Sequence, residues 1–467
     1  MKKIALTTVA IYFTSVALIY ASDPQQNQAL PNFIIIFTDD QGYGDLGVYG
    51  HPTIKTPSLD RMAFEGQKWT SFYVAASVCT PSRAGLLTGR LPVRSGMSSD
   101  KRRVLFPDSK GGLPETEITI ARMLKTAGYS TAAIGKWHLG HLPQYLPTSH
   151  GFDHYYGIPY SNDMDIQEEI KGYDDYFAIF NDPKVETFNV PLMRDTSIIE
   201  RPAEQTTITK RYTQEAVKYI TENKEHPFFL YVAHSFPHVP LFTSEEFKGK
   251  SERGLYGDVI EEIDWSVGEI LKTLKDEGLD KNTLVVFTSD NGPWLIFGTD
   301  GGSAGLLYGG KGTSYEGGVR EPAIFWWPET IQPAVISKMG STLDILPTFA
   351  SLSHAELPDD RIYDGYDLSP VLLGKDANPR DEMFYYHSQK LFAARKGKFK
   401  LHYLTNNPMG YPEDLKKLEK YKLYNLEEDP SEKHDIIDQN PEIVKEIEEM
   451  VAIHLQSVVP VENQLEK

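Results

Sequence analysis

The sequence has 467 residues, 40% of them hydrophobic and 24% charged, which is typical of a globular protein with two or three domains. The net charge of -18 argues against nucleic acid as a partner, because binding to the phosphate backbone requires a basic face. One cysteine in the whole chain excludes an intrachain disulfide, so packing and any bound metal must supply the stability.

The N-terminus has the pattern of an export signal. A basic start is followed by a nearly uninterrupted apolar run over residues 4–20 and then by the small residues Ala21 and Ser22. The run is shorter than the roughly 20 residues that cross a bilayer as a stable helix. We therefore expect residues 1–22 to be a cleaved signal peptide and the protein to be periplasmic or extracellular, with an uncleaved membrane anchor as the alternative.

Strand and helix patterns alternate from Pro31 onward. Continuous apolar runs typical of buried parallel strands occupy residues 33–37, 129–134, 227–233, 284–288 and 322–327. Helical patterns lie between them, as at 116–128 and 256–278. This alternation predicts an α/β fold, a large mostly parallel sheet flanked by helices, over residues 23–377. Ligands bind beyond the carboxyl ends of the strands in such folds.

The only cysteine, Cys79, begins the segment CTPSRAGLLTGR. A single cysteine is most often a buried small hydrophobic residue, but a thiol beside a turn and near Arg83 is also placed for reaction, because positive charge favours its ionised form. The segment resembles the signature of the type I sulfatases of the alkaline phosphatase superfamily. In that family the cysteine of the CxPSR core is oxidised to formylglycine, by a formylglycine-generating or an anaerobic sulfatase-maturating enzyme.

Two pairs of oxygen donors follow predicted strands. Asp39 and Asp40 come after the first strand, and Asp290 and Asn291 come after the strand at 284–288. Each pair alone could be a turn or a helix cap. Together they supply four hard oxygen donors, which suit calcium or magnesium better than zinc. The resemblance implies one calcium ion on these four residues together with the modified Cys79.

Cationic and histidine side chains follow other strands. Lys136 and His138 lie in GKWHLG and are two positions apart, so in an extended chain they project to the same side. His234 ends the strand at 227–233, with His238 four positions on. Lys311 lies in the glycine-rich string GGKGTSYEGGVREP, where the backbone can approach an anion closely. The resemblance assigns site positions to Arg83, Lys136, His138, His234 and Lys311.

The charges of these residues can be summed. A divalent cation with Arg83, Lys136 and Lys311 brings five positive charges, against three negative charges from the aspartates at 39, 40 and 290. Such a pocket attracts an anionic ester even on an acidic protein, because a cleft focuses the local field.

The resemblance implies a mechanism in which a hydroxyl of hydrated formylglycine attacks sulfur and its second hydroxyl later expels sulfate. Calcium and Arg83 would stabilise the hydrate, and Asp290 or His138 would accept its proton. Lys136, Lys311 and the metal would hold the sulfate oxygens, and His234 would be the general acid for the leaving oxygen.

The chain after about Asn378 reads as a smaller subdomain, residues 378–467. Strand patterns at 383–387, 391–395 and 399–403 predict an antiparallel sheet, and 441–456 reads as a terminal amphipathic helix. This part is similar to the C-terminal part of the arylsulfatase A and N-acetylgalactosamine-6-sulfatase branch. The mixed-charge run 413–422 is read as a solvated helix face.

Substrate-selecting residues are harder to identify. Ser161 and His402 are candidates to contact substrate, although a core or surface position is the default for His402. The tyrosines at 155, 156 and 160 could pack on a sugar ring or be structural.

The sequence therefore predicts an exported, formylglycine-dependent hydrolase of sulfate esters, with a sulfated sugar of a glycan as substrate. The alternatives are a phosphonate or phosphate ester hydrolase of the same superfamily and an inactive protein that binds sulfated glycans.

Overall fold

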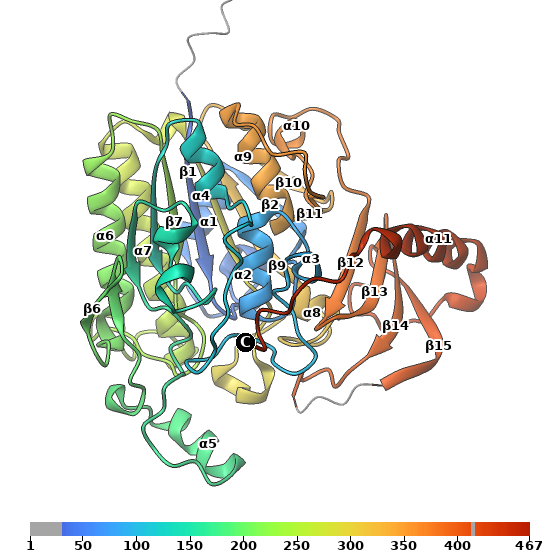
Figure 1. Ribbon diagram of the computed structural model, residues 1–467, viewed down its shortest axis with the longest axis horizontal. Helices are drawn as coiled ribbons and strands as arrows, with labels where there is room; N and C mark the ends of the chain where they lie inside the picture. The colour runs from blue at the N-terminus through green and yellow to red at the C-terminus, as the bar shows by residue number, and fades with distance from the viewer. Residues whose placement is uncertain (1–29, 412–415) are drawn as a thin grey trace, which may run out of the picture.

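A computed structural model describes residues 30–411 and 416–467, and it contains two sheets. The larger sheet has 11 strands (Figure 1). Their order along the main path is β10 (Ala334–Ile336), β2 (Gln67–Tyr73), β9 (Arg320–Trp326), β8 (Thr283–Ser289), β1 (Asn32–Thr38), β7 (Phe228–Ala233), β3 (Ser130–Gly135), β4 (His154–Gly157), β5 (Leu192–Arg194) and β6 (Ser197–Glu200), and β11 (Gly340–Ser341) pairs with β2.

The centre of this sheet is parallel, as predicted. β1 pairs in parallel with β7 and β8, and β3 pairs in parallel with β7. All residues of β1, β7 and β8 are buried, which explains why their sequences are continuous apolar runs and not alternating ones. β9 runs antiparallel to both β8 and β2, so the sheet is mixed at this side.

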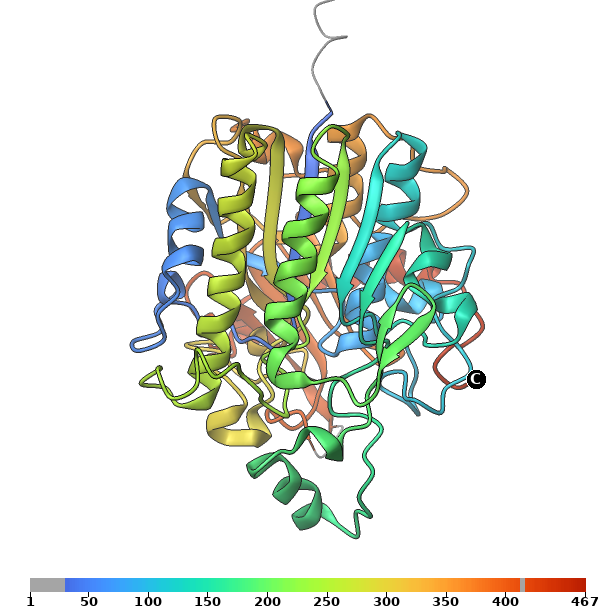
Figure 2. The ribbon, with the colours of Figure 1, turned by 90° about the vertical axis from the view of Figure 1, so that its left-hand side faces the viewer.

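Helices cover both faces of the large sheet. On the face of Ile34 and Ile36 lie α1 (Pro57–Glu65), α6 (Ile208–Glu222) and α7 (Leu255–Asp276), the last two in front of the strands in Figure 2. On the face of Phe33 and Ile35 lie α2 (Cys79–Thr88), α4 (Ile120–Thr126), α9 (Ile345–Ser353) and α10 (Ser369–Leu372). α7 and β1 fall within a residue or two of their predicted bounds, whereas α4 is shorter than the predicted 116–128 because Thr119 caps its N-terminus.

The smaller sheet is antiparallel, with the order β12 (Glu382–His387), β13 (Lys390–Lys396), β14 (Phe399–Thr405), β15 (Lys416–Asn425). The terminal helix α11 (Pro441–Ser457) packs on it through Ile447 and Val451. This confirms the predicted fold class, and Figure 1 shows the smaller sheet beside the large one.

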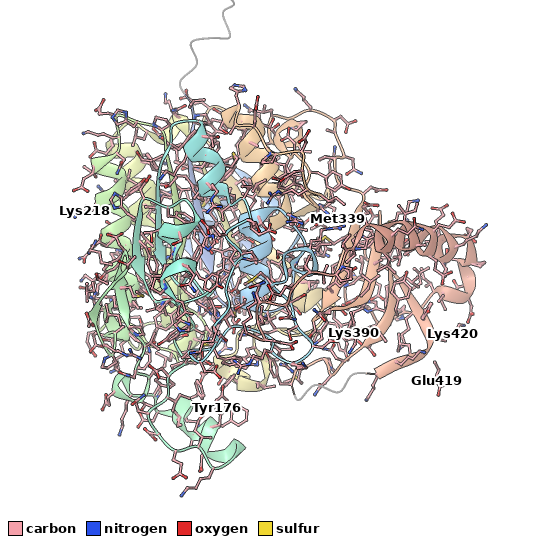
Figure 3. The ribbon with its side chains drawn as sticks, viewed as in Figure 1. Tyr176, Lys218, Met339, Lys390, Glu419 and Lys420 are labelled. Carbon is pink, nitrogen blue, oxygen red and sulfur yellow. The ribbon has the colours of Figure 1, made fainter. Side chains whose placement is uncertain are left out.

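The predicted helix at 413–422 is wrong where the structure describes it. Residues from Lys416 onward form the edge strand β15, paired antiparallel with β14. Solvation was predicted correctly, since Glu419 and Lys420 are exposed on this edge (Figure 3). The run of charges suits an edge strand, because charged side chains there discourage pairing with other chains.

The remaining elements are short or lie at the periphery. They include α3 (Pro92–Ser95), α8 (Glu316–Val319) and α5 (Tyr173–Asn181), and α5 protrudes below the sheet in Figure 1. The predicted signal peptide, residues 1–22, lies outside the described residues. Within 30–411 and 416–467, no helix is long and apolar enough to cross a membrane.

Candidate active site

The two pairs of oxygen donors meet at the carboxyl edge of the sheet. Thr38 of β1 lies opposite Ser289 of β8, so the residues that follow the two strands are neighbours. The backbone N–H of Asp40 donates to Asp290 Oδ1 at 3.1 Å, and Asn291 Nδ2 donates to Asp40 Oδ1 at 2.7 Å. Asp40 has φ 64°, a left-handed conformation that lets the chain turn back toward β8.

Three buried cations surround these carboxylates. Lys136 Nζ donates to Asp39 Oδ2 at 2.5 Å, and Lys311 Nζ donates to Asp40 Oδ2 at 2.6 Å. Arg83 binds Asp290 Oδ2 through Nε at 3.0 Å and Nη2 at 2.8 Å. Lys136 and Arg83 are fully buried and Lys311 is 3% exposed, so these charges act at low dielectric.

Cys79 is the first residue of α2, and all ten residues of that helix are buried. Its Sγ lies within 4.8 Å of carboxylate oxygens of Asp39 and Asp290, and a second such group joins it to Asp40 and His238. The predicted convergence of Cys79 with the oxygen donors is therefore present in the fold.

The thiol of Cys79 is not activated as cysteine. Burial raises its pKa well above the ordinary value, although Lys136 and Lys311 act to lower it. The expectation that nearby positive charge would favour a thiolate is thus outweighed by desolvation.

The residues fit a divalent cation. Asp39 Oδ1 and Asn291 Oδ1 are buried without a hydrogen-bond partner. Burial acts to raise the pKa of Asp39, but Lys136 and the other cations outweigh it and hold that pKa well below its ordinary value. Burial raises the pKa of Asp40 to about 6 and that of Asp290 to about 7, and the nearby Asp39 carboxylate adds to both shifts. A hard cation bound to these oxygens would reduce the repulsion between the carboxylates and would give the two unpaired oxygens a ligand.

A cavity of about 680 Å³ opens over Cys79. Its polar lining includes His138, Ser161, His238 and Lys311. Its wall is strongly apolar and aromatic, formed by Val104, Phe106, Met164, Tyr176, Phe177, Trp294, Ile296 and Tyr411. Tyr176, labelled in Figure 3, comes from the protruding α5, so this helix contributes to the pocket.

Lys136, His138 and Ser161 all reach the site, but not in the way the spacing suggested. Ser161 Oγ accepts from Lys136 Nζ at 3.1 Å. His138 has φ 59°, so the chain is turned and not extended here, and its Nε2 lies 2.8 Å from Leu105 O. Burial and Lys136 hold the pKa of His138 well below its ordinary value.

Two predicted histidines are not brought to the cavity. His234 is buried on the sheet face of Ile34 and Ile36, where its Nε2 lies 3.4 Å from Ser266 Oγ of α7. The backbone of His234 still follows the strand, since its N–H donates to Phe37 O at 2.8 Å. Side chains alternate between the faces of a strand, so the side chain of His234 lies on the same face as that of Val232, two residues before it. His402 is buried and its Nε2 lies 2.6 Å from Glu432 Oε1, the core placement that was the default.

His238 takes the place that was predicted for His234. It lines the cavity, its Nε2 is 3.6 Å from Asp40 Oδ2, and its Nδ1 lies 2.5 Å from Val239 O. The tyrosines at 155, 156 and 160 are buried and absent from the cavity lining. The two histidines are four positions apart and would share one face of a continuous strand, so strand parity does not separate them; Pro237, which interrupts regular structure between them, was the signal in the sequence.

Two family models match this chain. A model described as "Sulfatase" matches residues 31–355, and one described as "C-terminal region of aryl-sulfatase" matches residues 378–467. Arylsulfatase A of Homo sapiens is 40% identical over 449 residues, covering 91% of this chain and 88% of that protein. N-acetylgalactosamine-6-sulfatase of Rattus norvegicus is 41% identical over 409 residues, covering 84% and 74%.

Solved structures give the same result. The PsFucS1 sulfatase from Pseudoalteromonas sp. superposes with a TM-score of 0.82 at 30% identity, covering 93% of this chain and 91% of that chain. Ps i-CgsB in complex with k-i-k-neocarrahexaose superposes with a TM-score of 0.77 at 30% identity, covering 93% and 95%. The chain therefore belongs to the sulfatase family and is a sulfuric ester hydrolase.

Proposed function

We propose that the protein removes sulfate from a sugar of a sulfated glycan, with formylglycine formed from Cys79 as the nucleophile and one Ca²⁺ in the site. The observation that supports this most directly is the position of Cys79, on the floor of the cavity and within 4.8 Å of two groups of metal-binding atoms. The raised pKa of the unmodified thiol supports the same proposal, since cysteine itself would be a poor nucleophile there.

Hydrated formylglycine supplies two hydroxyls on one carbon, one to attack sulfur and one to release sulfate afterwards. The chain's own residues set up this reaction. Arg83 neutralises Asp290 and holds it beside position 79 through two hydrogen bonds, so that a carboxylate oxygen is available to accept the hydroxyl proton. His138, whose Nδ1 is buried without a partner, is the alternative acceptor.

The lysines serve the sulfate group. Lys136 Nζ binds Asp39 and Lys311 Nζ binds Asp40. Both ammonium groups would donate to sulfate oxygens, where negative charge grows in the transition state. The indole of Trp294 lies 4.2 Å from Lys311 Nζ, which keeps that ammonium directed into the cavity. His238 borders the same space. Its Nδ1–H faces Val239 O, so it would donate from Nε2 toward the leaving oxygen as the protonated imidazolium and be left as the neutral ring.

Calcium is the ion that the donor set favours. Asp39, Asp40, Asp290 and Asn291 offer oxygen atoms only, which suits a hard cation. All four side chains are buried, whereas Mg²⁺ usually keeps several of its waters and binds through only one or two carboxylates. When bound, Ca²⁺ would act as a Lewis acid toward sulfate and stabilise the nucleophilic oxygen.

A glycan substrate is supported by the wall of the cavity. Five aromatic side chains line it: Phe106, Tyr176, Phe177, Trp294 and Tyr411. Aromatic faces pack against the apolar faces of sugar rings, while the polar floor holds the ester. Two similar proteins support the same substrate class: N-acetylgalactosamine-6-sulfatase, and Ps i-CgsB in complex with k-i-k-neocarrahexaose.

We further propose that the protein is exported with residues 1–22 removed, that residues 23–377 form the catalytic domain and 378–467 the C-terminal subdomain, and that a dedicated maturation enzyme modifies Cys79. The export pattern at the N-terminus supports the first point. The gap between the two family matches supports the boundary.

Turnover of an aryl sulfate, a phosphate diester, a phosphonate monoester and a panel of sulfated mono- and oligosaccharides would test the proposal. We expect the sulfated sugars to have the highest kcat/KM. Aryl sulfate turnover without any sulfated sugar accepted would contradict the glycan assignment. A plain thiol at position 79 in protein from its native host, found by peptide mass analysis, would contradict formylglycine catalysis.

A further inference from the structure

The C-terminal subdomain contacts the loop that carries Lys311 at both of its ends. This loop, defined here as residues 309–319, runs from the cavity to β9. Near Lys311, Asn406 Nδ2 donates to Gly312 O at 2.6 Å. The N–H of the same Gly312 donates to Ser77 O at 2.8 Å, two residues before Cys79. Gly312 is therefore held between the segment of Cys79 and the subdomain.

Gly410 makes the closest approach. It has φ +77°, and a Cβ added there would lie 1.9 Å from Lys311 O. Only glycine fits, because both the left-handed backbone and the backbone contact exclude a side chain. The next residue, Tyr411, lines the cavity and packs on Trp294 with ring centroids 5.3 Å apart. Trp294 is the ring on which the Lys311 ammonium rests.

A buried ionic network holds the other end of the loop. Glu316 Oε1 accepts from Lys400 Nζ at 2.9 Å, and the N–H of Glu316 donates to Glu432 Oε2 at 2.7 Å. His402 binds Glu432 as well, which gives this histidine a structural role in place of the predicted contact with substrate. Lys400, Glu316 and His402 are fully buried, so each charge depends on its partner.

We infer that the C-terminal subdomain is a working part of the active site: residues 406–411 position Lys311 for the sulfate, and Tyr411 completes the cavity wall. Asn406 and Gly410 are positioning residues that act through the Lys311 loop. This inference rests on the proposed role of Lys311 in binding sulfate. It explains why a separate sheet is attached to a domain that already carries all the oxygen donors and the nucleophile.

The test compares two glycines that share a backbone conformation. Gly410→Ala forces the added methyl against Lys311 O, whereas a methyl added at Gly374, which has φ +75°, would meet nothing within 4 Å, so Gly374→Ala imposes only the left-handed strain. We expect Gly410→Ala to lower kcat/KM for an aryl sulfate by about 10- to 100-fold, the effect of a displacement near 1 Å at a reacting centre. Gly374→Ala should stay within about twofold of the wild-type value.

Inorganic sulfate provides a second readout that a purely structural role would not change. Its competitive inhibition constant should rise with Gly410→Ala and rise less with Asn406→Ala. The melting temperature should fall further for Gly410→Ala than for Gly374→Ala, because only the former adds a clash with Lys311 O to the left-handed strain. If Gly410→Ala does not fold, Asn406→Ala provides the test, because it removes one hydrogen bond to the loop without adding a clash.

Two results would overturn the inference. One is equal kcat/KM and equal sulfate inhibition for the Gly410 and Gly374 variants. The other is loss of activity in Asn406→Ala that follows melting temperature alone. Failure of the proposed function looks different, because the wild-type enzyme would then show no turnover of sulfate esters at all.

Discussion

The two neighbouring histidines allow a sharp test of the site. His238 lines the cavity, and its Nε2 lies 3.6 Å from Asp40 Oδ2, beside the space for the leaving group. His234 is four residues away but faces Ser266 of α7, on the sheet face of Ile34 and Ile36. His238→Gln and His234→Gln therefore make the same chemical change inside and outside the cavity.

The expected losses differ by orders of magnitude. A side chain that transfers a proton or donates to the leaving oxygen typically contributes about 10²- to 10⁴-fold, which corresponds to roughly 3–5 kcal/mol at about 1.36 kcal/mol per tenfold. We expect His238→Gln to lose a factor in this range on an alkyl or sugar sulfate. His234→Gln should cost only about 1 kcal/mol of stability, for one lost buried hydrogen bond, and leave turnover within about twofold.

Leaving-group dependence is the decisive assay. Initial rates with 4-nitrophenyl sulfate and with a sugar sulfate give kcat/KM for each variant. Nitrophenolate leaves without a proton, so the deficit of His238→Gln should be at least about tenfold smaller on the aryl ester. The assignment would be refuted if His234→Gln lost more activity than His238→Gln, or if the deficit of His238→Gln were the same on both substrates.

Three further predictions concern other parts of the site. Arg83→Met should destabilise the protein by about 3–5 kcal/mol in chemical denaturation, because it leaves the carboxylate of Asp290 buried without its cation; an unchanged midpoint would contradict this. Removal of metal with a chelator should lower both activity and melting temperature, with Ca²⁺ restoring them better than Mg²⁺; saturation at about 100 times the Kd is worth roughly 2.7 kcal/mol, and better rescue by Mg²⁺ would contradict the choice of ion. Burial acts to raise the pKa of Glu316, but Lys400 and Arg320 outweigh it and hold the pKa below its ordinary value of 4.5, so the stability that this carboxylate contributes is present above that pH and is lost as the pH falls below it. Melting curves between pH 6 and pH 3 should show that Glu316→Gln is less stable than wild type at pH 6 and loses less on acidification, and parallel losses would contradict the assignment.

The central strands could be predicted from the sequence because burial on both faces makes each of them a continuous apolar run. β1, β7 and β8 follow this rule, and β8 matches its predicted bounds to one residue at each end. The peripheral strands could not be predicted this way. β6 is Ser197–Glu200, with three of four residues exposed, and half of the residues of β15 are charged, so neither carries a hydrophobic period.

The composition of the site was more predictable than its geometry. Residue types at strand ends indicated a metal, an anion and a nucleophile, and the fold brings together Asp39, Asp290, Arg83 and Cys79. The orientation of each side chain depends on local backbone that motifs do not specify. His138 turns through a positive φ, and His234 continues the strand for one more residue, so its side chain falls on the wrong face for catalysis.

The depth of Cys79 limits when it can be altered. The side chain is 2% exposed, and the nine residues that follow it in α2 are buried as well. An enzyme that modifies this segment must bind it in an exposed, unfolded form, whereas the segment is a buried helix in the folded protein. Any such conversion must therefore precede the collapse of the polypeptide around α2, and mature protein that has kept its thiol would have to unfold before it could be repaired.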